Sequence, residues 1–281
     1  MKKLIAMLLA LTMVLAFAGC AKTEAPVTTA APETTAAPET TEAAPVETAA
    51  PETEAAVAAV MTHEEYMAAP MDSEVTIETY VQGHQSWWDG KITVYCQSPD
   101  GAYFLYELQC SEEDAAKLEK GTKIRVNGFK GEWSGEVEVM DGTFEFVEGG
   151  DTFVAEPADV TGLLGTDALV DHQNEAVCFK GLTVVARLDT NGDPMKDANG
   201  KELSFSYNYD GSGEQGNDLY FNVSVGDQVF EFCVESYLCG ADTEVYKAVE
   251  ALKIGDTIDA EGFLYWYNGV NPHITSVTVV E

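Results

Sequence analysis

Basic residues are scarce in this 281-residue chain, which has 15 Lys and Arg against 48 Asp and Glu and a formal net charge of −33. The part from Met61 to Glu281 holds 41 of the acidic residues and 12 of the basic ones. Such a surface repels nucleic-acid phosphates and anionic lipid headgroups, whereas it accommodates neutral ligands, cationic ligands and divalent cations. From net charge alone, we expect no nucleic-acid partner.

The motifs of the common hydrolases, metalloproteases and nucleotide-binding enzymes are also missing. The sequence contains no G-x-S-x-G, H-E-x-x-H or G-x-x-x-x-G-K-[ST], and none of its four histidines has an obvious nucleophile partner. Carboxylates are so numerous that a catalytic pair among them would not stand out. We expect no catalytic residues, no enzymatic activity and no cofactor other than the calcium ion considered below.

Cysteine usage excludes two further classes of site. After Cys20 the chain has five cysteines, an odd number, and it has no C-x-x-C. This pattern argues against a complete disulfide framework and against a zinc site. The sequence favours small apolar side chains in strands and leaves the chemical state of the five thiols open: Cys96, Cys110, Cys178, Cys233 and Cys239.

The first twenty residues lack the length of a membrane span. They read MKKLIAMLLALTMVLAFAGC, in which two lysines precede an apolar run shorter than about 20 residues, as in a secretory signal. The ending FAGC resembles a bacterial lipobox, although Phe17 stands where that family usually has an aliphatic residue. The resemblance implies that residues 1–19 are removed and that lipidated Cys20 anchors the chain to the extracellular face of the cell membrane. The alternative is a secretory signal whose cysteine is incidental.

Residues 20–60 contain no aromatic side chain and consist mainly of Ala, Pro, Thr and Glu, with APETTAAPETTEAAP as their clearest unit. A chain of this composition cannot bury enough apolar surface to offset the entropy lost on ordering. We therefore expect a disordered acidic stalk. In a polyproline-like conformation it would reach roughly 120 Å, at about 3.1 Å per residue.

One stretch of the remaining chain is written twice. LEKGTKIRVNGF, from Leu118 to Phe129, matches LKIGDTIDAEGF, from Leu252 to Phe263, with a constant separation of 134 positions. Gly135 and Gly269 keep the same separation. We interpret the stretch as the end of a helix and the following strand in each of two related domains.

Alternating apolar residues predict the same order of elements around both copies. In the first copy, strands at 74–82, 91–97 and 102–109 precede a short helix capped by Ser111, and strands at 122–129 and 136–149 follow. In the second copy, strands at 175–186, 219–225 and 228–238 precede a helix capped by Asp242 or Thr243, and strands at 257–267 and 273–280 follow.

This order resembles the OB-fold, a five-stranded barrel with a helix between its third and fourth strands. Gly128 suits the bend of the fourth strand at a barrel corner. The predicted fold is all-β with short helices: two tandem five-stranded OB-like barrels, at residues 61–150 and 151–281, after the stalk. A single continuous sandwich is the alternative.

Aromatic residues gather in the loops that flank the ligand face of an OB barrel, which lies over strands two and three. Trp87, Trp88 and Trp133 occupy such loops in the first copy, and Tyr265, Trp266 and Tyr267 in the second. Flat rings stack on sugars and bases, so these residues are candidate ligand contacts; alternatively they close the barrel core. Because neighbouring residues of a strand point to opposite faces, we expect Trp87 to be exposed and Trp88 to be buried.

A calcium site is a second candidate. Asp189, Asn191 and Asp193 repeat at a spacing of two, as the oxygen ligands of calcium loops do. Pro194 and Gly200 stand where an EF-hand requires Gly and Glu. The same residue types also build ordinary turns.

The lipobox, the acidic stalk and the tandem barrels together resemble an uncharacterised type of lipoprotein found in gut-dwelling Gram-positive anaerobes, a family with no agreed activity. The resemblance implies a membrane-anchored, non-catalytic binding or scaffold module, with carbohydrate or cell-wall glycan as its ligand. The alternatives are accessory OB domains of a secreted hydrolase or nuclease system, or a nucleic-acid binder, which the net charge disfavours. A protein ligand and the oligomeric state stay open.

Overall fold

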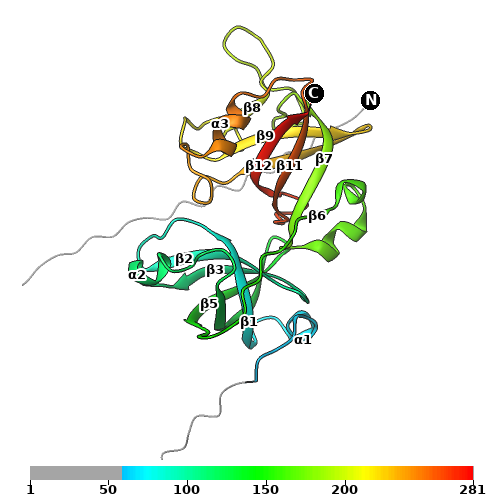
Figure 1. Cartoon of the computed structure of the whole chain (residues 1–281). Coiled ribbons are helices and arrows are strands. Elements are labelled where there is room, and N and C mark those ends of the chain that lie inside the picture. Colours follow the sequence, from blue (N-terminus) through cyan, green and yellow to red (C-terminus); the bar gives the residue numbers. More distant parts are fainter. Residues whose placement is uncertain (1–58, 281) are drawn as a thin grey trace, which may run out of the picture. The chain divides into compact units, whose positions relative to one another are not determined.

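The structure, a computed structural model, describes residues 59–280. Cys20, the predicted signal and almost all of the predicted stalk therefore lie outside the described residues. The described part belongs to one compact unit, Ala55–Glu281. Two closed five-stranded barrels make up this part, so the predicted fold class is confirmed (Figure 1).

The first barrel has the strand order β1-β2-β3-β5-β4, in which β3 and β5 are parallel and the other pairs antiparallel. Short α2 (Glu112–Ala115) stands between the third and fourth strands. This is the topology of an OB barrel. The strands are β1 (Glu74–His84), β2 (Lys91–Ser98), β3 (Gly101–Gln109), β4 (Lys123–Trp133) and β5 (Glu136–Phe146).

The second barrel repeats this topology, with β7, β9, β10, β12 and β11 closing on one another. Two short strands extend the sheet at its edges: β6 (Ala158–Asp159) beside β7, and β8 (Phe205–Tyr207) beside β9. The barrel strands are β7 (Ala176–Val185), β9 (Leu219–Val225), β10 (Gln228–Val234), β11 (Thr257–Phe263) and β12 (His273–Val280). Two 3-10 helices, η1 (Thr161–Leu163) and η2 (Asp167–His172), precede β7. Within residues 59–280, each barrel closes on its own strands.

The repeated dozen residues build the fourth strand of each barrel. Gly128 and Gly262 lie where the register of this strand shifts against the fifth strand. A Cβ on Gly128 would lie 2.7 Å from Val139, and one on Gly262 would lie 2.2 Å from the His273 carbonyl oxygen. Both glycines are therefore required by a close approach at the barrel corner, as the sequence indicated.

The predicted caps of the two helices are present. Ser111 Oγ accepts a hydrogen bond from the Asp114 amide at the start of α2. Thr243 rather than Asp242 caps α3 (Glu244–Glu250), because its Oγ1 accepts from the Tyr246 amide. The Val245, Val249 and Leu252 side chains of α3 and its end are buried in the core of the second barrel, as their spacing predicts.

A further helix, α1 (His63–Ala68), was missed in the sequence and packs on the first barrel. Its Tyr66 joins the barrel core, where the ring lies 5.1 Å from that of Tyr103. Lys130 of β4 is buried and donates to the carbonyl oxygens of Met67 and Ala69, at the end of the helix. The helix is short, and its anchor depends on residues more than sixty positions away, so local periodicity does not reveal it.

The five cysteines of the described part are free and buried, two in the first barrel and three in the second. Burial raises the pKa of each thiol, to about 11 for Cys110 and Cys239. The inference against a disulfide framework thus holds for these residues. No helix of residues 59–280 is long and apolar enough to cross a membrane.

Candidate functional site

The two barrels contact each other through the outer face of β2 and β3. Tyr95 of β2 stacks on Phe263 of β11, with ring centroids 4.5 Å apart, and Phe104 of β3 packs against Tyr265. Gln97 accepts a hydrogen bond from the Ala176 amide across the same junction. Because OB barrels bind ligands on this face, most of the ligand face expected for the first barrel is covered by the second.

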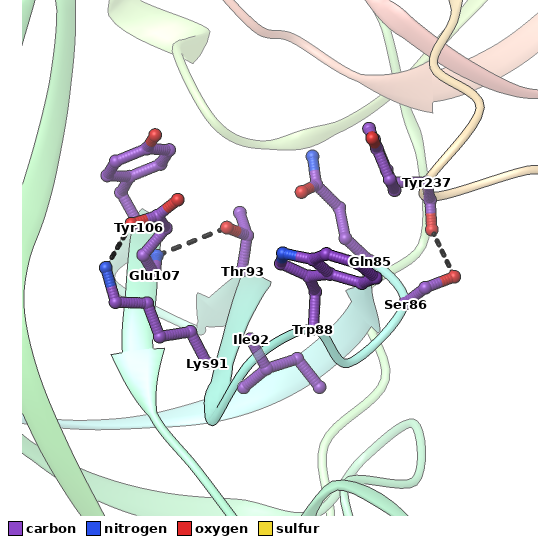
Figure 2. Close-up of a pocket in the computed structure, with 9 residues that line it drawn as sticks. All are labelled: Gln85, Ser86, Trp88, Lys91, Ile92, Thr93, Tyr106, Glu107 and Tyr237. Atoms are coloured by element: carbon purple, nitrogen blue, oxygen red, sulfur yellow. Dashed lines mark hydrogen bonds and ion pairs between the residues drawn. The ribbon is translucent and has the colours of Figure 1, made fainter. Parts of the chain in front are cut away.

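A pocket remains at the uncovered end of this face. Its volume is about 270 Å³. Residues 85–88 of the β1–β2 connection, β2, β3 and the segment after β10 all contribute to it (Figure 2). The lining residues are Gln85, Ser86, Trp88, Lys91, Ile92, Thr93, Tyr106, Glu107 and Tyr237. Three aromatic rings thus line a pocket that is slightly smaller than the roughly 300–1,000 Å³ of drug-sized ligand sites. The pocket therefore has room for one ring of a longer ligand.

A tight turn places Trp88 beside Lys91. The backbone amides of these two residues each donate to the other's carbonyl oxygen, at 3.0 and 2.9 Å. Asp89 and Gly90 between them both have positive φ, which is the geometry of a two-residue hairpin turn. The D-G dipeptide is the sequence signal for this hairpin turn. The turn leaves the Trp88 ring exposed to solvent.

The expectation for the two adjacent tryptophans is right for Trp87 and wrong for Trp88. Trp87 is 37% exposed, and its indole N–H donates to the Cys110 carbonyl oxygen at 2.8 Å, whereas Trp88 is 76% exposed rather than buried. Trp88 begins a hairpin turn instead of lying on an extended strand, so strict alternation does not apply to it.

A bulge in β3 brings two consecutive side chains to the pocket. The register between β2 and β3 shifts near Thr93, and Glu107 has a φ of 48°. The Glu107 amide donates to Thr93 Oγ1, and the Glu107 carboxylate lies 2.6 Å from Lys91 Nζ. Tyr106 and Glu107 therefore both face outward, where strict alternation would bury one of them. The two charged residues of the lining neutralise each other.

The second barrel supplies the remaining wall. Ser86 donates from its amide and from its hydroxyl to the Tyr237 carbonyl oxygen, at 2.7 and 3.2 Å. The Tyr237 ring is 60% exposed beside the pocket (Figure 2). Sequence reasoning missed Tyr106 and Glu107 because their position depends on the β3 bulge. It missed Tyr237 because this residue reaches the pocket only through packing between the barrels.

The other predicted contacts lie elsewhere. Trp133 is 60% exposed at the end of β4, and the turn that follows it packs on Trp266 near Gly135. Tyr265 is part of the junction, where its ring stacks on His273, and Tyr267 is exposed. The structure thus brings Trp88 to the pocket, whereas Trp87, Trp133, Tyr265, Trp266 and Tyr267 do not line it.

Glu136 makes the junction sensitive to protonation. Its Oε2 accepts from the Trp266 amide at 2.8 Å, while its Oε1 and Asn174 Oδ1 are buried and have no hydrogen-bond partner among the described residues. Burial raises the pKa of Glu136 to about 9, which outweighs the lowering by Trp266 and Asn174. A protonated Glu136 supplies the donor that this pair of oxygens lacks.

The second barrel covers its own ligand face with the long connection between β7 and β8. Arg187 at its start is only 2% exposed and donates to Asn222 of β9, to Ser206 of β8 and to the carbonyl oxygens of Leu188 and Tyr209. It also lies 2.7 Å from the Glu231 carboxylate of β10. One guanidinium thus ties this connection to the strands that it covers.

The candidate calcium residues form a turn. Asp189 Oδ1 accepts from the amides of Asn191 and Asp193, at 2.8 and 2.9 Å. Eight residues later Asp197 repeats this turn with Asn199 and Lys201, although a lysine cannot bind a cation. The turn explains the spacing of two without a metal ion. Within residues 59–280, no three His, Cys, Asp or Glu side chains gather as metal ligands.

No family model and no curated protein matches this chain. Its fold is similar to solved structures that hold OB barrels. The p204 HINb domain is 8% identical with a TM-score of 0.33, covering 75% of this chain and 100% of that domain. A murine DNA-binding protein bound to double-stranded DNA is 11% identical with a TM-score of 0.32, over 73% and 99% of the two chains. The single-stranded DNA-binding protein from Thermus aquaticus is 11% identical with a TM-score of 0.24, over 75% and 95%.

These comparisons correct one expectation. The absence of a nucleic-acid partner was inferred from net charge, and it is contradicted because the similar proteins include DNA-binding ones. Net charge averages over the whole surface, whereas a ligand contacts one local patch of it.

Proposed function

We propose that this chain is a non-catalytic binding module of the cell surface, and that its pocket takes one ring of a carbohydrate such as a cell-wall glycan. The observation that supports this most is the exposed Trp88 ring, which lines the pocket together with Tyr106, Tyr237 and polar side chains. A sugar ring stacks its apolar face on an aromatic ring and directs its hydroxyls to polar side chains at the edge. The paired Lys91 and Glu107 leave the pocket without net charge, which suits a neutral ligand.

The test is binding of a glycan array by the chain from Ala21 to Glu281, followed by titration calorimetry on the glycans found. Trp88→Ala is expected to weaken binding at least tenfold with an unchanged melting temperature. Trp133→Ala is the matched control, because that ring is also exposed and does not line the pocket. Equal losses of affinity for both variants, or no loss for Trp88→Ala, would show that this pocket is not the glycan-binding site.

A single-stranded oligonucleotide is the second arm of the same experiment. Bases stack on exposed aromatic rings as sugars do, so Trp88 offers them a platform as well. Binding of the oligonucleotide that is lost in Trp88→Ala, with no glycan bound, would replace carbohydrate as the ligand of this pocket.

We also propose that lipidated Cys20 holds the module on the outer face of the cell membrane, as the FAGC ending and the acidic stalk support. Cys20 lies outside the described residues. Cys20→Ser is expected to move the protein from the membrane fraction to the medium. An unmodified Cys20 in the mass spectrum of the native protein would exclude this anchor.

A further inference from the structure

We propose that Lys91 and Glu107 together recognise two adjacent hydroxyls of a sugar ring that lies on Trp88. One hydroxyl donates to the Glu107 carboxylate, and its neighbour accepts from the Lys91 ammonium. The two residues are then the specificity-determining residues of the pocket, and its ligand is a neutral carbohydrate with a free vicinal diol. This inference rests on the proposed function, because it concerns the ligand of the same pocket.

The hairpin turn places Lys91 beside the Trp88 ring. The two residues exchange both of their backbone hydrogen bonds, so they lie directly opposite each other. Side chains of directly opposite residues project from the same face, with their Cβ atoms about 4.5–5.5 Å apart. Figure 2 shows the ion pair of Lys91 and Glu107 on one side of Trp88 and Tyr237 on the other. A sugar that stacks on Trp88 therefore has this ion pair at its edge.

The bulge of β3 fixes the direction of the Glu107 side chain. Its φ of 48° lies in the left-handed region, and its amide donates to Thr93 Oγ1 at 3.2 Å. Glycine takes such a position in a bulge without strain, whereas glutamate there costs stability. Strain of this kind is typical of binding sites, where a side chain has to point in one direction. Here it directs the carboxylate to Lys91.

The ion pair keeps part of its hydrogen-bonding capacity. Lys91 Nζ lies 2.6 Å from Glu107 Oε2, which uses one of the three N–H groups of the ammonium. Among residues 59–280, neither Glu107 Oε1 nor the other N–H groups of Lys91 have a hydrogen-bond partner. The pair therefore offers an acceptor and donors on neighbouring atoms, with no net charge.

A vicinal diol matches this arrangement. The oxygens of two adjacent hydroxyls on a sugar ring are separated by about one hydrogen-bond length, so they reach the carboxylate and the ammonium together. Each hydroxyl both donates and accepts, so each side of the ion pair is satisfied. A phosphate or carboxylate has acceptors only and is repelled by Glu107, and a cation is repelled by Lys91.

The first test uses the chain from Ala21 to Glu281 and a glycan array probed before and after mild periodate treatment. Periodate cleaves the carbon–carbon bond between adjacent hydroxyls and leaves isolated hydroxyls intact. The glycans that the parent binds are expected to lose their signal after treatment. Glycans that bind equally before and after treatment would overturn the inference, while the proposed function would stand.

The second test measures the preference by titration calorimetry with two glucose tetrasaccharides. The four-linked one has adjacent hydroxyls on its inner rings, and the three-linked one has none there. The parent is expected to bind the four-linked probe about tenfold more tightly, the effect of one hydrogen bond to a charged group. Equal affinities of the parent for the two probes would contradict the proposal.

Variants assign this preference to the ion pair. Lys91→Met and Glu107→Met are each expected to reduce the preference to less than twofold with little change in melting temperature, because an exposed ion pair contributes little to stability. Glu113→Met is the matched control, since Glu113 forms an exposed ion pair with Lys117 outside the pocket. A preference that survives Lys91→Met would overturn the assignment.

Exchanging the two residues separates a diol from the edge of a nucleic-acid base. A base has its donor and acceptor in a fixed order, whereas either hydroxyl of a diol donates or accepts. The double variant Lys91→Glu with Glu107→Lys is therefore expected to keep the preference for the four-linked probe within about threefold. Loss of the preference in this variant would contradict recognition of a diol. If the parent binds no glycan at all, the proposed function and this inference both fail.

Discussion

The two barrels have fourth strands of similar sequence, and they differ in the connection between their first two strands. In the first barrel, residues 85–90 make a short connection with a hairpin turn, which leaves Trp88 in solvent. In the second barrel, the connection between β7 and β9 runs from 186 to 218 and includes β8, and Arg187 fastens it over the outer face of β9 and β10. The residues repeated in the sequence are thus those that close each barrel. The connection between the first two strands, which is not repeated, decides whether the ligand face of the barrel is exposed to solvent.

The largest effect is expected from removing the Arg187 guanidinium. Arg187→Met removes the guanidinium from Ser206, Glu231 and Asn222, of which Asn222 Oδ1 keeps the Leu188 amide as a donor, at a cost of about 3–5 kcal/mol in the free energy of unfolding. Lys117→Met is the control, since Lys117 forms only exposed ion pairs with Glu113 and Asp114 of α2, and its loss is expected to change the free energy of unfolding far less. Urea unfolding measures both. Equal costs would mean that Arg187 does not hold the connection in place.

The shared glycines provide a test of the repeat itself. A side chain on Gly262 meets the backbone carbonyl of His273, whereas one on Gly128 meets the more adaptable Val139 side chain first. We expect Gly262→Ala to destabilise the protein by about 1–3 kcal/mol or more, and Gly128→Ala by less. Gly162→Ala, at a site with nothing within 4 Å, is expected to leave the urea midpoint unchanged. A larger cost for Gly128→Ala than for Gly262→Ala would contradict this ranking of the two close approaches.

The junction between the barrels gives a dependence on pH. Glu136 ionises near 4.5 in the unfolded chain and near 9 in the folded one. Between these values the folded state retains a proton that the unfolded state releases, so the contribution of Glu136 to stability is fully present below about pH 4.5 and falls as the pH rises toward 9. The slope is at most about 1.4 kcal/mol per pH unit. Glu138 and Glu235, whose pKa values burial raises to about 7, add to the fall below pH 7.

Replacing the carboxyl by its neutral amide isolates this contribution. Glu136→Gln is expected to flatten the dependence of the melting temperature on pH between 7 and 9. Glu132→Gln, at an exposed position of β4, is expected to leave it as in the parent. A slope that is the same in all three proteins would place the titrating group elsewhere.

The smallest effect is expected from calcium. The Asp189 turn is complete with backbone amides, and the Asp197 turn has the same form with Lys201 in it. We therefore expect equal melting temperatures in millimolar calcium and in chelator. Any ligand that binds the folded state preferentially must raise this temperature, so a rise that is lost in Asp193→Asn would restore the calcium site.

Local patterns were enough to predict both barrels. Strict alternation marks strands such as β4, and Ser111 and Thr243 mark the starts of helices, because in both cases the signal and the structure lie within a few residues of each other. By contrast, α1 was missed because Lys130 of β4, 64 positions after Tyr66 in the sequence, lies over the Tyr66 ring and donates to the carbonyl oxygen of Met67.

The pocket was predicted only in part, for a related reason. Trp88 could be chosen because an aromatic residue in that loop is unusual in itself. Its exposure depends on the turn at Asp89 and Gly90, and the D-G signal was present but was not used. Tyr237 is 149 residues away and reaches the site only because the barrels pack together. No periodicity within either barrel carries that information.

The rate at which the buried cysteines are alkylated measures how often each barrel opens. The thiolate is the form of cysteine that attacks an alkylating reagent, so a buried cysteine with a raised pKa reacts only after its surroundings open. Cys96 and Cys110 report on the first barrel, and Cys178, Cys233 and Cys239 on the second. Mass spectra taken during alkylation would resolve a population that gains two labels, one that gains three, or one that gains all five together. The order of these populations gives the rate at which each barrel opens, and a concerted gain of five means that the junction makes both barrels one kinetic unit.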